Sequence, residues 1–204
     1  MPYIDLTIPF TSSMPVFPGD PASSLTQSAF LDKNGYNDHK LLTAMHVGTH
    51  IDAPLHMIAN GKKISDFKPE KFIGKGVLID ARDKTIDEKL LNGVRLDSES
   101  IVLVYTGHSR KFQALDYHES YPEITEGFAK ALIAHKVKIV GMDTPSPDKS
   151  PFTVHKLLLS SEILIIENLM NLDKLLKIEQ FDVIALPMNL ETDAAPIRVV
   201  AKFA

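Results

Sequence analysis

Three histidines and one aspartate occupy even-numbered positions in the stretch AMHVGTHIDAPLHM, residues 44–57. They are His46, His50, Asp52 and His56. Neutral imidazole and carboxylate suit divalent zinc or manganese at neutral pH, and a carboxylate has two oxygens with which it can bridge two ions. Because burying such a group without a metal would be costly, the stretch predicts a metal site and not a set of ordinary polar residues.

The spacing of these residues restricts the backbone that carries them. In a straight strand, His46 and His50 would lie ~13 Å apart, too far to share an ion. One helical turn would make them neighbours, but a helix cannot continue to the last histidine, because Pro54 disfavours helical geometry at the residue before it. We therefore expect a compact turn over 46–50, followed by a bend that folds the later residues back. Gly48 would permit a close approach of the backbone or a positive φ in that turn.

Short apolar runs rich in Val and Ile predict β-strands, several of them buried on both faces. These runs are YIDLTI (3–8), KGVLID (75–80), SIVLVYT (100–106), VKIVGMD (137–143), EILIIEN (162–168), FDVIALP (181–187) and IRVVAKF (197–203). Helical patterns cover 125–136, 153–161 and 171–178, with Thr125 and Asn171 as expected N-caps. Strands that alternate with helices indicate an α/β fold with a mixed sheet. The segment 110–122 has no period and predicts a long loop of the kind that often belongs to an active site.

Composition bounds the organisation and the partners of the chain. With 204 residues, 44% of them hydrophobic, and no internal repeat or linker, we expect a single domain over 1–204. A net charge of −4, with basic side chains scattered among acidic ones, argues against nucleic acid. No apolar run approaches the ~20 residues of a membrane span, and the N-terminus lacks the features of a signal peptide. The absence of cysteine excludes disulfides and cysteine-ligated metals. We expect a cytoplasmic protein that acts on a small molecule.

The run from His46 to His56 reads HVGTHIDAPLH, which resembles the H-x-G-T-H-x-D-x-P-x-H signature of the cyclase family of metal-dependent hydrolases. That family includes bacterial kynurenine formamidases and isatin hydrolases. Three further segments are similar to family elements: MPVFPGDP (14–21), VGMDTPSPD (140–148) and VHKLLLSSEILIIENLMNL (154–172). The resemblance implies a swivelling β/β/α fold, in which a mixed sheet curls toward a barrel with helices outside.

Carried over residue by residue, the resemblance also implies a site and an oligomer. Five residues would bind two zinc ions, or alternatively manganese, with the aspartate as the bridge: His46, His50, Asp52, His155 and Glu167. His56 would be the general acid and base and not a primary ligand. The chain would form a homodimer or a larger homo-oligomer.

The implied reaction is hydrolysis of an amide, with the formyl group of N-formylkynurenine as the first expectation. The metals would make hydroxide available at neutral pH and stabilise the tetrahedral oxyanion. His56 would take the proton of the attacking water and return it to the leaving nitrogen.

One position departs from the family pattern. Kynurenine formamidases carry a tryptophan in the N-terminal loop that packs on the aromatic substrate, whereas this chain has no tryptophan and places Phe17 there. Phenylalanine still stacks on a ring, but with less area and no indole N–H. Phe17 is thus expected either to contact substrate or only to pack the loop. His108 and His118 are candidates for the pocket wall or for the surface.

Three functions remain open. The first is an arylformamidase, and the second is a hydrolase of the same chemistry that opens a cyclic amide, as isatin hydrolases do, or cleaves another acyl substrate. The third is a non-catalytic module with a structural metal. Structural zinc sites normally use Cys or His at all four positions, whereas this cluster is rich in carboxylate, so the third ranks last. Asp143 and Asp148 are expected to serve turns and hydrogen bonds.

Overall fold

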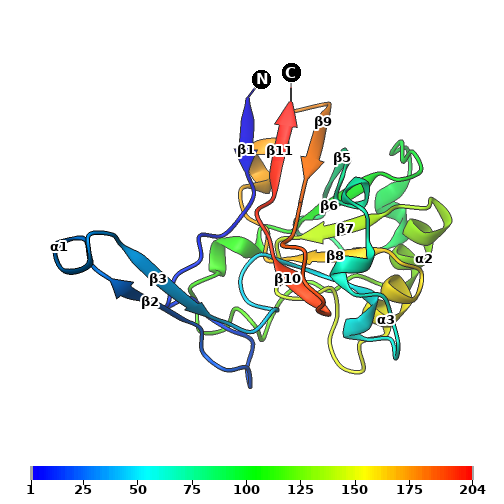
Figure 1. The fold of residues 1–204 in the computed structure, drawn as a ribbon. Helices are drawn as coiled ribbons and strands as arrows, with labels where there is room; N and C mark the ends of the chain where they lie inside the picture. Colours follow the sequence, from blue (N-terminus) through cyan, green and yellow to red (C-terminus); the bar gives the residue numbers. More distant parts are fainter. Residues whose placement is uncertain (1, 204) are drawn as a thin grey trace.

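A nine-stranded mixed sheet forms the frame of the protein in a computed structural model that describes residues 2–203 (Figure 1). The strand order is β1-β11-β9-β5-β6-β7-β8-β4-β10. The strands are β1 (Tyr3–Asp5), β4 (His50–Asp52), β5 (Ile73–Asp80), β6 (Ile101–Tyr105), β7 (Ile139–Met142), β8 (Leu164–Glu167), β9 (Phe181–Ile184), β10 (Ala194–Pro196) and β11 (Val200–Phe203). Strands β5 to β8 run parallel, and the other neighbours pair antiparallel. The curled mixed sheet confirms the expected fold class.

Two helices cover one face of this sheet, α2 (Glu126–Ala134) and α3 (Thr153–Ser160). The Thr125 side chain caps α2 by accepting a hydrogen bond from the Phe128 N–H, as expected. Alternate residues of the central strands point to opposite faces. In β6, Val102 packs toward the helices, while Leu103 packs into the core on the other face. Burial on both faces explains why these strands read as continuous apolar runs.

Shorter helices connect the strands. They are the α-helical turn α1 (Leu31–Asn34) and the 3₁₀ helices η1 (Pro54–His56), η2 (Ile64–Asp66), η3 (Pro69–Phe72), η4 (Glu88–Leu91), η5 (His108–Lys111) and η6 (Leu172–Leu175). The helix expected over 171–178 is only the single turn η6, and its predicted side-chain cap is wrong. Asn171 instead donates from Nδ2 to the carbonyl of Asp5 at 2.8 Å. Within residues 2–203, no helix has the length and apolar content to cross a membrane.

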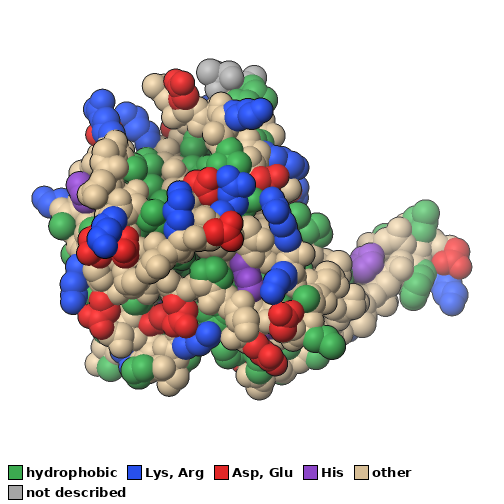
Figure 2. All heavy atoms as spheres, turned by 180° about the vertical axis from the view of Figure 1, so that it is seen from behind, with side chains coloured by type: hydrophobic (Ala, Val, Ile, Leu, Met, Phe, Trp, Pro, Cys, Tyr) green, Lys and Arg blue, Asp and Glu red, His purple; other side chains and the backbone are tan. Residues whose placement is uncertain are grey.

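An arm projects from the body of the molecule (Figures 1 and 2). It is a two-stranded antiparallel ribbon of β2 (Ser24–Ala29) and β3 (Asp38–Leu42), with α1 at its tip. Every residue of β3 is exposed, and large apolar side chains are exposed along the arm: Leu25, Phe30, Leu31, Tyr36, Leu41 and Leu42. On the body, acidic and basic side chains are intermixed over the face seen in Figure 2.

All seven predicted strands are present, most of them shorter than the apolar runs that signalled them. Four strands were not predicted: β2 and β3 of the arm, β4 within the histidine stretch, and β10 near the C-terminus. The last two are three residues long, too short to show a period, and they form by pairing with distant strands. Strand β4 carries His50 and Asp52 of the site, and β10 pairs with it.

Candidate metal centre and pocket

Residues 44–57 form a turn, a short strand and a 3₁₀ helix. Residues 45–49 make the compact turn, and Gly48 has a positive φ of 65°, as expected. No helical turn joins His46 to His50, because His50 already begins β4. The turn folds the His46 ring back, so that the two ring centroids lie 5.1 Å apart. His50 and Asp52 are two residues apart on one strand, so their side chains share a face.

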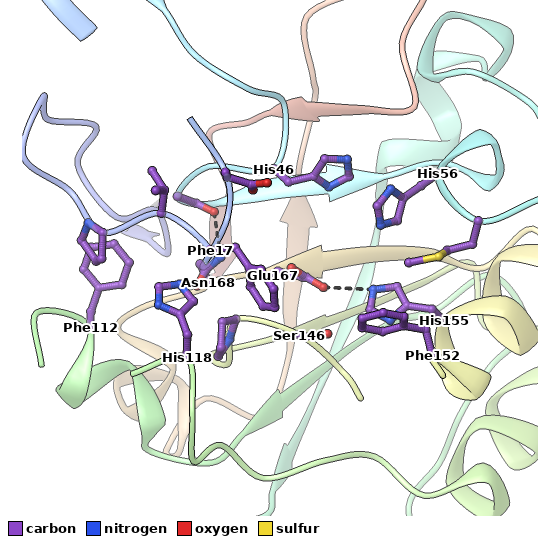
Figure 3. A pocket seen from close by; sticks show the side chains of 16 residues that line it. Phe17, His46, His56, Phe112, His118, Ser146, Phe152, His155, Glu167 and Asn168 are labelled. Atoms are coloured by element: carbon purple, nitrogen blue, oxygen red, sulfur yellow. Dashed lines mark hydrogen bonds and ion pairs between the residues drawn. The ribbon is translucent and has the colours of Figure 1, made fainter. Parts of the chain in front are cut away.

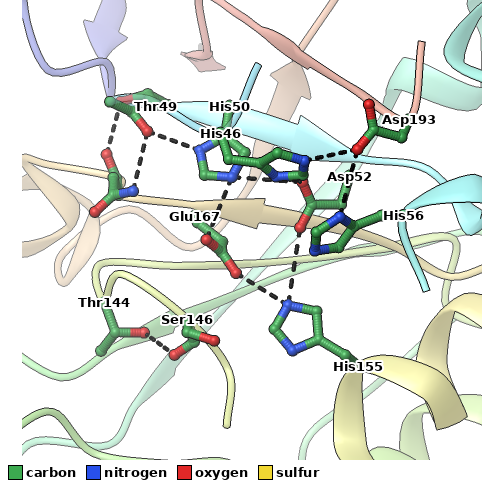
Figure 4. Close-up of polar contacts among 12 residues, drawn as sticks. His46, Thr49, His50, Asp52, His56, Thr144, Ser146, His155, Glu167 and Asp193 are labelled. Atoms are coloured by element: carbon green, nitrogen blue, oxygen red, sulfur yellow. Dashed lines mark hydrogen bonds and ion pairs between the residues drawn. The ribbon is translucent and has the colours of Figure 1, made fainter. Parts of the chain in front are cut away.

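The pairing of β4 with β8 brings Glu167 to the face of the sheet that carries His50 and Asp52. Glu167 ends β8 directly opposite His50 in the antiparallel pair with β4. The Glu167 Oε2 lies 3.3 Å from His50 Nε2, and its Oε1 lies 3.3 Å from Nε2 of His155, which projects from α3 (Figure 4). His155 Nε2 is also 3.9 Å from an Asp52 oxygen. The structure therefore brings together all the residues predicted to bind metal.

The buried atoms of this cluster fit a divalent cation. Three of them, His50 Nε2 and both carboxylate oxygens of Asp52, have no hydrogen-bond partner among residues 2–203. His46 Nδ1 lies 2.9 Å from Asp52 Oδ1, but without hydrogen-bond geometry. A buried carboxylate without a partner is costly, and nitrogen and oxygen donors of this kind are ligands of zinc and manganese. The donor set therefore suits a divalent metal.

The potential ligand atoms form two groups that share one residue. One group contains His46, Asp52 and His56, and the other contains His50, Asp52 and Glu167. Within each group the atoms lie within 4.8 Å of one another. Because a carboxylate offers two oxygens, Asp52 has the position that a bridge between two ions requires.

The charges of the cluster shift the pKa values of its members. Burial opposes protonation of His46, but the neighbouring Asp52 outweighs it and raises the pKa of His46 to about 10. His155 is likewise buried, and contacts with Asp148 and Glu167 raise its pKa to about 10. The adjacent histidines lower the pKa of Asp52 despite its burial. Without a metal, the raised pKa values favour positive charge on the rings of His46 and His155, which lies beside the buried carboxylates of Asp52 and Glu167.

His56 differs from the other histidines of the site. It is the last residue of η1, and its ring centroid lies 4.1 Å from that of His46. Burial lowers its pKa, and the neighbouring His46 and His155 act in the same direction, while Asp52 opposes them. A ring with a lowered pKa is neutral near pH 7 and is able to accept a proton.

The cluster opens onto a pocket of about 260 Å³ (Figure 3). Its lining contains His46, His56, His155 and Glu167 from the cluster, and the aromatic side chains of Phe17, Phe112, His118 and Phe152. The Phe17 and His118 rings meet edge to face, with centroids 5.6 Å apart. The long loop predicted over 110–122 thus contributes to the pocket, as expected. His108 does not line the pocket; it is buried, and its Nε2 lies 2.8 Å from the carbonyl of Tyr117.

Hydrogen bonds connect the pocket loop to the turn of the metal cluster. Tyr117 donates from its hydroxyl to Asn168 Oδ1 at 2.7 Å, and Asn168 donates from Nδ2 to the carbonyl of Gly48 at 3.0 Å. Asp148 accepts hydrogen bonds from the Val154 N–H and from His155, in the role expected of it. Asp143 similarly accepts from the backbone of Thr106 and Gly107.

Several residues at the site were not singled out from the sequence. Phe112, Phe152 and Asn168 line the pocket, and Asp193 contacts two histidines of the cluster. Asp193 precedes the unpredicted strand β10, whose pairing with β4 places it beside the cluster. An aspartate in a polar stretch carries no signal of such a contact, because 147 residues separate it from His46.

A curled mixed sheet that carries a buried histidine–carboxylate cluster beside an aromatic pocket is an arrangement suited to metal-assisted hydrolysis. Residues 4–149 match the model of the family described as Putative cyclase, and the chain belongs to this family.

Three known proteins illustrate the relationship. A protein named Kynurenine formamidase, from Bacillus thuringiensis subsp. konkukian, is 31% identical over 98% of this chain and 97% of its own length. A structure described as a predicted metal-dependent hydrolase from Bacillus stearothermophilus is 27% identical, with a TM-score of 0.79 over 98% of this chain and 97% of that one. Isatin hydrolase A from Labrenzia aggregata shares the fold, with a TM-score of 0.87 and 23% identity over 99% and 93% of the two chains.

Proposed function

We propose that this hydrolase cleaves the formamide of an aromatic amine, with N-formylkynurenine as the leading substrate and kynurenine and formate as products. The observation that carries the proposal is the set of unpartnered buried atoms of His50 and Asp52 behind a pocket with aromatic walls. Relatives named Kynurenine formamidase, which match over nearly the full length of this chain, support a carbon–nitrogen bond outside peptides as the target.

We assign two divalent ions to the cluster, zinc first and manganese as the alternative. Five residues would hold them: His46, His50, Asp52, His155 and Glu167. The presence of Asp52 in both groups of ligand atoms supports its assignment as the bridge. When bound, such an ion supplies Lewis-acid chemistry, which makes a water molecule nucleophilic at neutral pH and polarises an acyl carbonyl.

We assign the proton transfers to His56. Its position in the pocket wall and its lowered pKa support a neutral ring that accepts the proton of the attacking water. The leaving arylamine nitrogen needs a proton as the carbon–nitrogen bond breaks, and the protonated His56 ring donates it. Because His56 also stands in one group of potential ligand atoms, its role requires a test separate from that of His50.

The pocket supports an aromatic substrate. Phe17, Phe112 and Phe152 offer ring faces and edges for packing against an aryl group. Such a lining excludes water from the reacting amide and leaves the polar end of the substrate near the cluster. Phe17 lines the pocket and is 36% exposed, so it is able to contact a bound ring.

We also infer a homodimer or a larger homo-oligomer. A two-stranded ribbon is marginally stable in isolation, and the apolar side chains along the arm support its burial against another copy. Light scattering of the wild type and of a Leu41→Asp, Leu42→Asp variant tests this inference. A monomeric wild-type chain would contradict it. We infer a cytoplasmic location, which the absence of cysteine supports.

A substrate panel tests the proposed function. The purified chain, loaded with zinc or manganese or treated with chelator, is assayed on N-formylkynurenine, formanilide and isatin. We expect metal-dependent hydrolysis, with the highest kcat/KM on N-formylkynurenine. Faster opening of isatin would favour a cyclic amide as the substrate. A metal-loaded chain that hydrolyses none of the three would favour a non-catalytic module.

A further inference from the structure

Each histidine assigned to metal uses its second ring nitrogen on an oxygen of the protein. His50 Nδ1 lies 2.9 Å from the carbonyl of Gly48, and His155 Nδ1 lies 2.6 Å from Asp148 Oδ1. His46 follows the same pattern with its other nitrogen, since Nε2 lies 2.9 Å from Asp193 Oδ2. A nitrogen that donates to oxygen is protonated, which leaves the lone pair of the other nitrogen free for a cation.

The acceptor of His46 also faces a second histidine, whereas the second contact of the Gly48 carbonyl is Asn168 and that of Asp148 is the Val154 N–H. The same oxygen, Asp193 Oδ2, lies 3.5 Å from His56 Nδ1 (Figure 4). The rings of His46 and His56 lie side by side, with an interplanar angle of 37°. One carboxylate oxygen thus faces both a proposed ligand and the proposed proton shuttle. Catalytic hydrogen bonds are often long before the substrate binds. The 3.5 Å between Asp193 Oδ2 and His56 Nδ1 is therefore short enough for a hydrogen bond to form between them when substrate binds.

The backbone of Asp193 holds this carboxylate in place. The Asp193 carbonyl accepts a hydrogen bond from the Ala53 N–H at 2.8 Å. The next residue, Ala194, pairs with Asp52 across β10 and β4. Thr192, on the other side, accepts a backbone hydrogen bond from Ile64 at 3.0 Å. These contacts tie Asp193 to the strand that carries Asp52 and to the start of η1, which carries His56.

We propose that Asp193 is the positioning residue that orients His46 and His56 together. Its carboxylate accepts a hydrogen bond from the Nε2–H of His46. The other nitrogen of that ring, Nδ1, then presents its lone pair toward Asp52. Asp193 also faces Nδ1 of His56, so that Nε2 is the nitrogen that exchanges protons in the pocket. This inference rests on the roles proposed above for the two histidines.

Two variants and a matched control test the proposal. Asp193→Ala removes the acceptor, and Asp193→Asn keeps the shape of the side chain while removing its charge. Glu191→Gln is the control, because Glu191 lies on the same segment but pairs with Lys63 at 3.0 Å, away from the cluster. Zinc affinity is measured by competition with a chelator, and the protonation of the His46 ring nitrogens by ¹⁵N NMR of the zinc-loaded protein.

Loss of an outer partner of a metal-binding histidine typically weakens metal affinity about 10- to 100-fold, and we expect this for Asp193→Ala. We also expect the protected His46 Nε2–H signal to disappear, and kcat at saturating zinc to fall with KM little changed. The zinc affinity and kcat of Asp193→Asn should lie between those of Asp193→Ala and the wild type. If Asp193→Ala does not fold, Asp193→Asn alone tests the role of Asp193. Wild-type affinity and an unchanged His46 signal in both variants would overturn the proposal.

The same experiment separates this proposal from the proposed function. A wild-type chain that binds zinc but hydrolyses no formamide contradicts the function, while the affinity and NMR comparisons still decide the role of Asp193. A wild-type chain that binds no divalent metal overturns both.

Discussion

His50 and Glu167 lie directly opposite each other in the antiparallel pair of β4 and β8, with His50 Nε2 3.3 Å from Glu167 Oε2. Directly opposite residues project to the same face of a sheet, so the register of this one pair aligns two proposed ligands. Asp52, two residues along β4, shares that face. A slip of one residue would turn the side chains of His50 and Asp52 to the opposite face, and the cluster would not form.

Asp52→Asn should remove both ions from the protein, because the remaining residues would lose the shared anionic oxygens that the two groups need. We expect about two ions per wild-type chain and few or none in the variant, measured by elemental analysis of protein purified without chelator. Asp182→Asn, on the exposed side of β9, is the control and should retain full metal content. Full metal content in Asp52→Asn would show that Asp52 is not a bridge.

His50→Ala and His56→Asn should separate metal binding from proton transfer. His50→Ala removes a proposed ligand, so metal content and activity should fall together. His56→Asn should retain the ions and lose about 10²- to 10⁴-fold in turnover of an amide, the usual effect of losing a general acid–base. The loss should be smaller on an activated ester, whose leaving group needs no proton. If His56→Asn loses as much metal as His50→Ala, His56 is a ligand.

Zinc affinity should rise with pH. In the metal-free protein the pKa values of His46 and His155 are each raised to about 10, so both rings carry protons at neutral pH. A cation binds the neutral rings, so zinc binding must release these protons, and competition from protons weakens as the pH approaches 10. Calorimetric zinc titrations in buffers of different ionisation enthalpy, between pH 6 and 8, count the protons released. Binding without proton release would contradict the prediction.

Phe17→Ala should weaken the binding of an aromatic formamide. An aromatic contact contributes about 1 kcal/mol, so KM should rise roughly fivefold while kcat changes little. Phe17→Trp adds ring area at the same position and should lower KM. Phe30→Ala, on the arm outside the pocket, is the control. Unchanged KM values in both Phe17 variants would mean that Phe17 only packs the N-terminal loop.

Tyr117→Phe should destabilise the fold. The variant leaves the buried Asn168 Oδ1 without its donor at 2.7 Å, and a buried acceptor left unsatisfied costs about 1–3 kcal/mol. Urea unfolding measures the change. Tyr36→Phe is the control, because the Tyr36 side chain is 60% exposed on the arm and its hydroxyl is free to contact water. Equal stabilities of the two variants would show that the hydrogen bond contributes nothing.

The predictable part of this structure is the part whose signal is local. The central strands are predictable because burial on both faces demands continuous runs of apolar residues, as in β6 and β8. The candidate ligands His46, His50 and Asp52 are predictable because they lie within a few residues of one another.

The unpredicted part depends on contacts between distant segments. Strand β4 has only three residues, and it forms because β8 and β10 flank it in the sheet. The helical turn that the spacing of His46 and His50 favours does not form, because pairing with β8 makes His50 the first residue of a strand. The role of Asp193 depends on the same pairing, because 147 residues separate it from His46.

The position of β4 between β8 and β10 also has a consequence for biosynthesis. His50 leaves the ribosome before its partner Glu167, and Asp193 follows later still. The emerging N-terminal half therefore holds histidines and an aspartate without the strands that pair with β4. Full-affinity zinc binding should begin only after β10 has been made, so metal capture follows the synthesis of every strand of the sheet except β11.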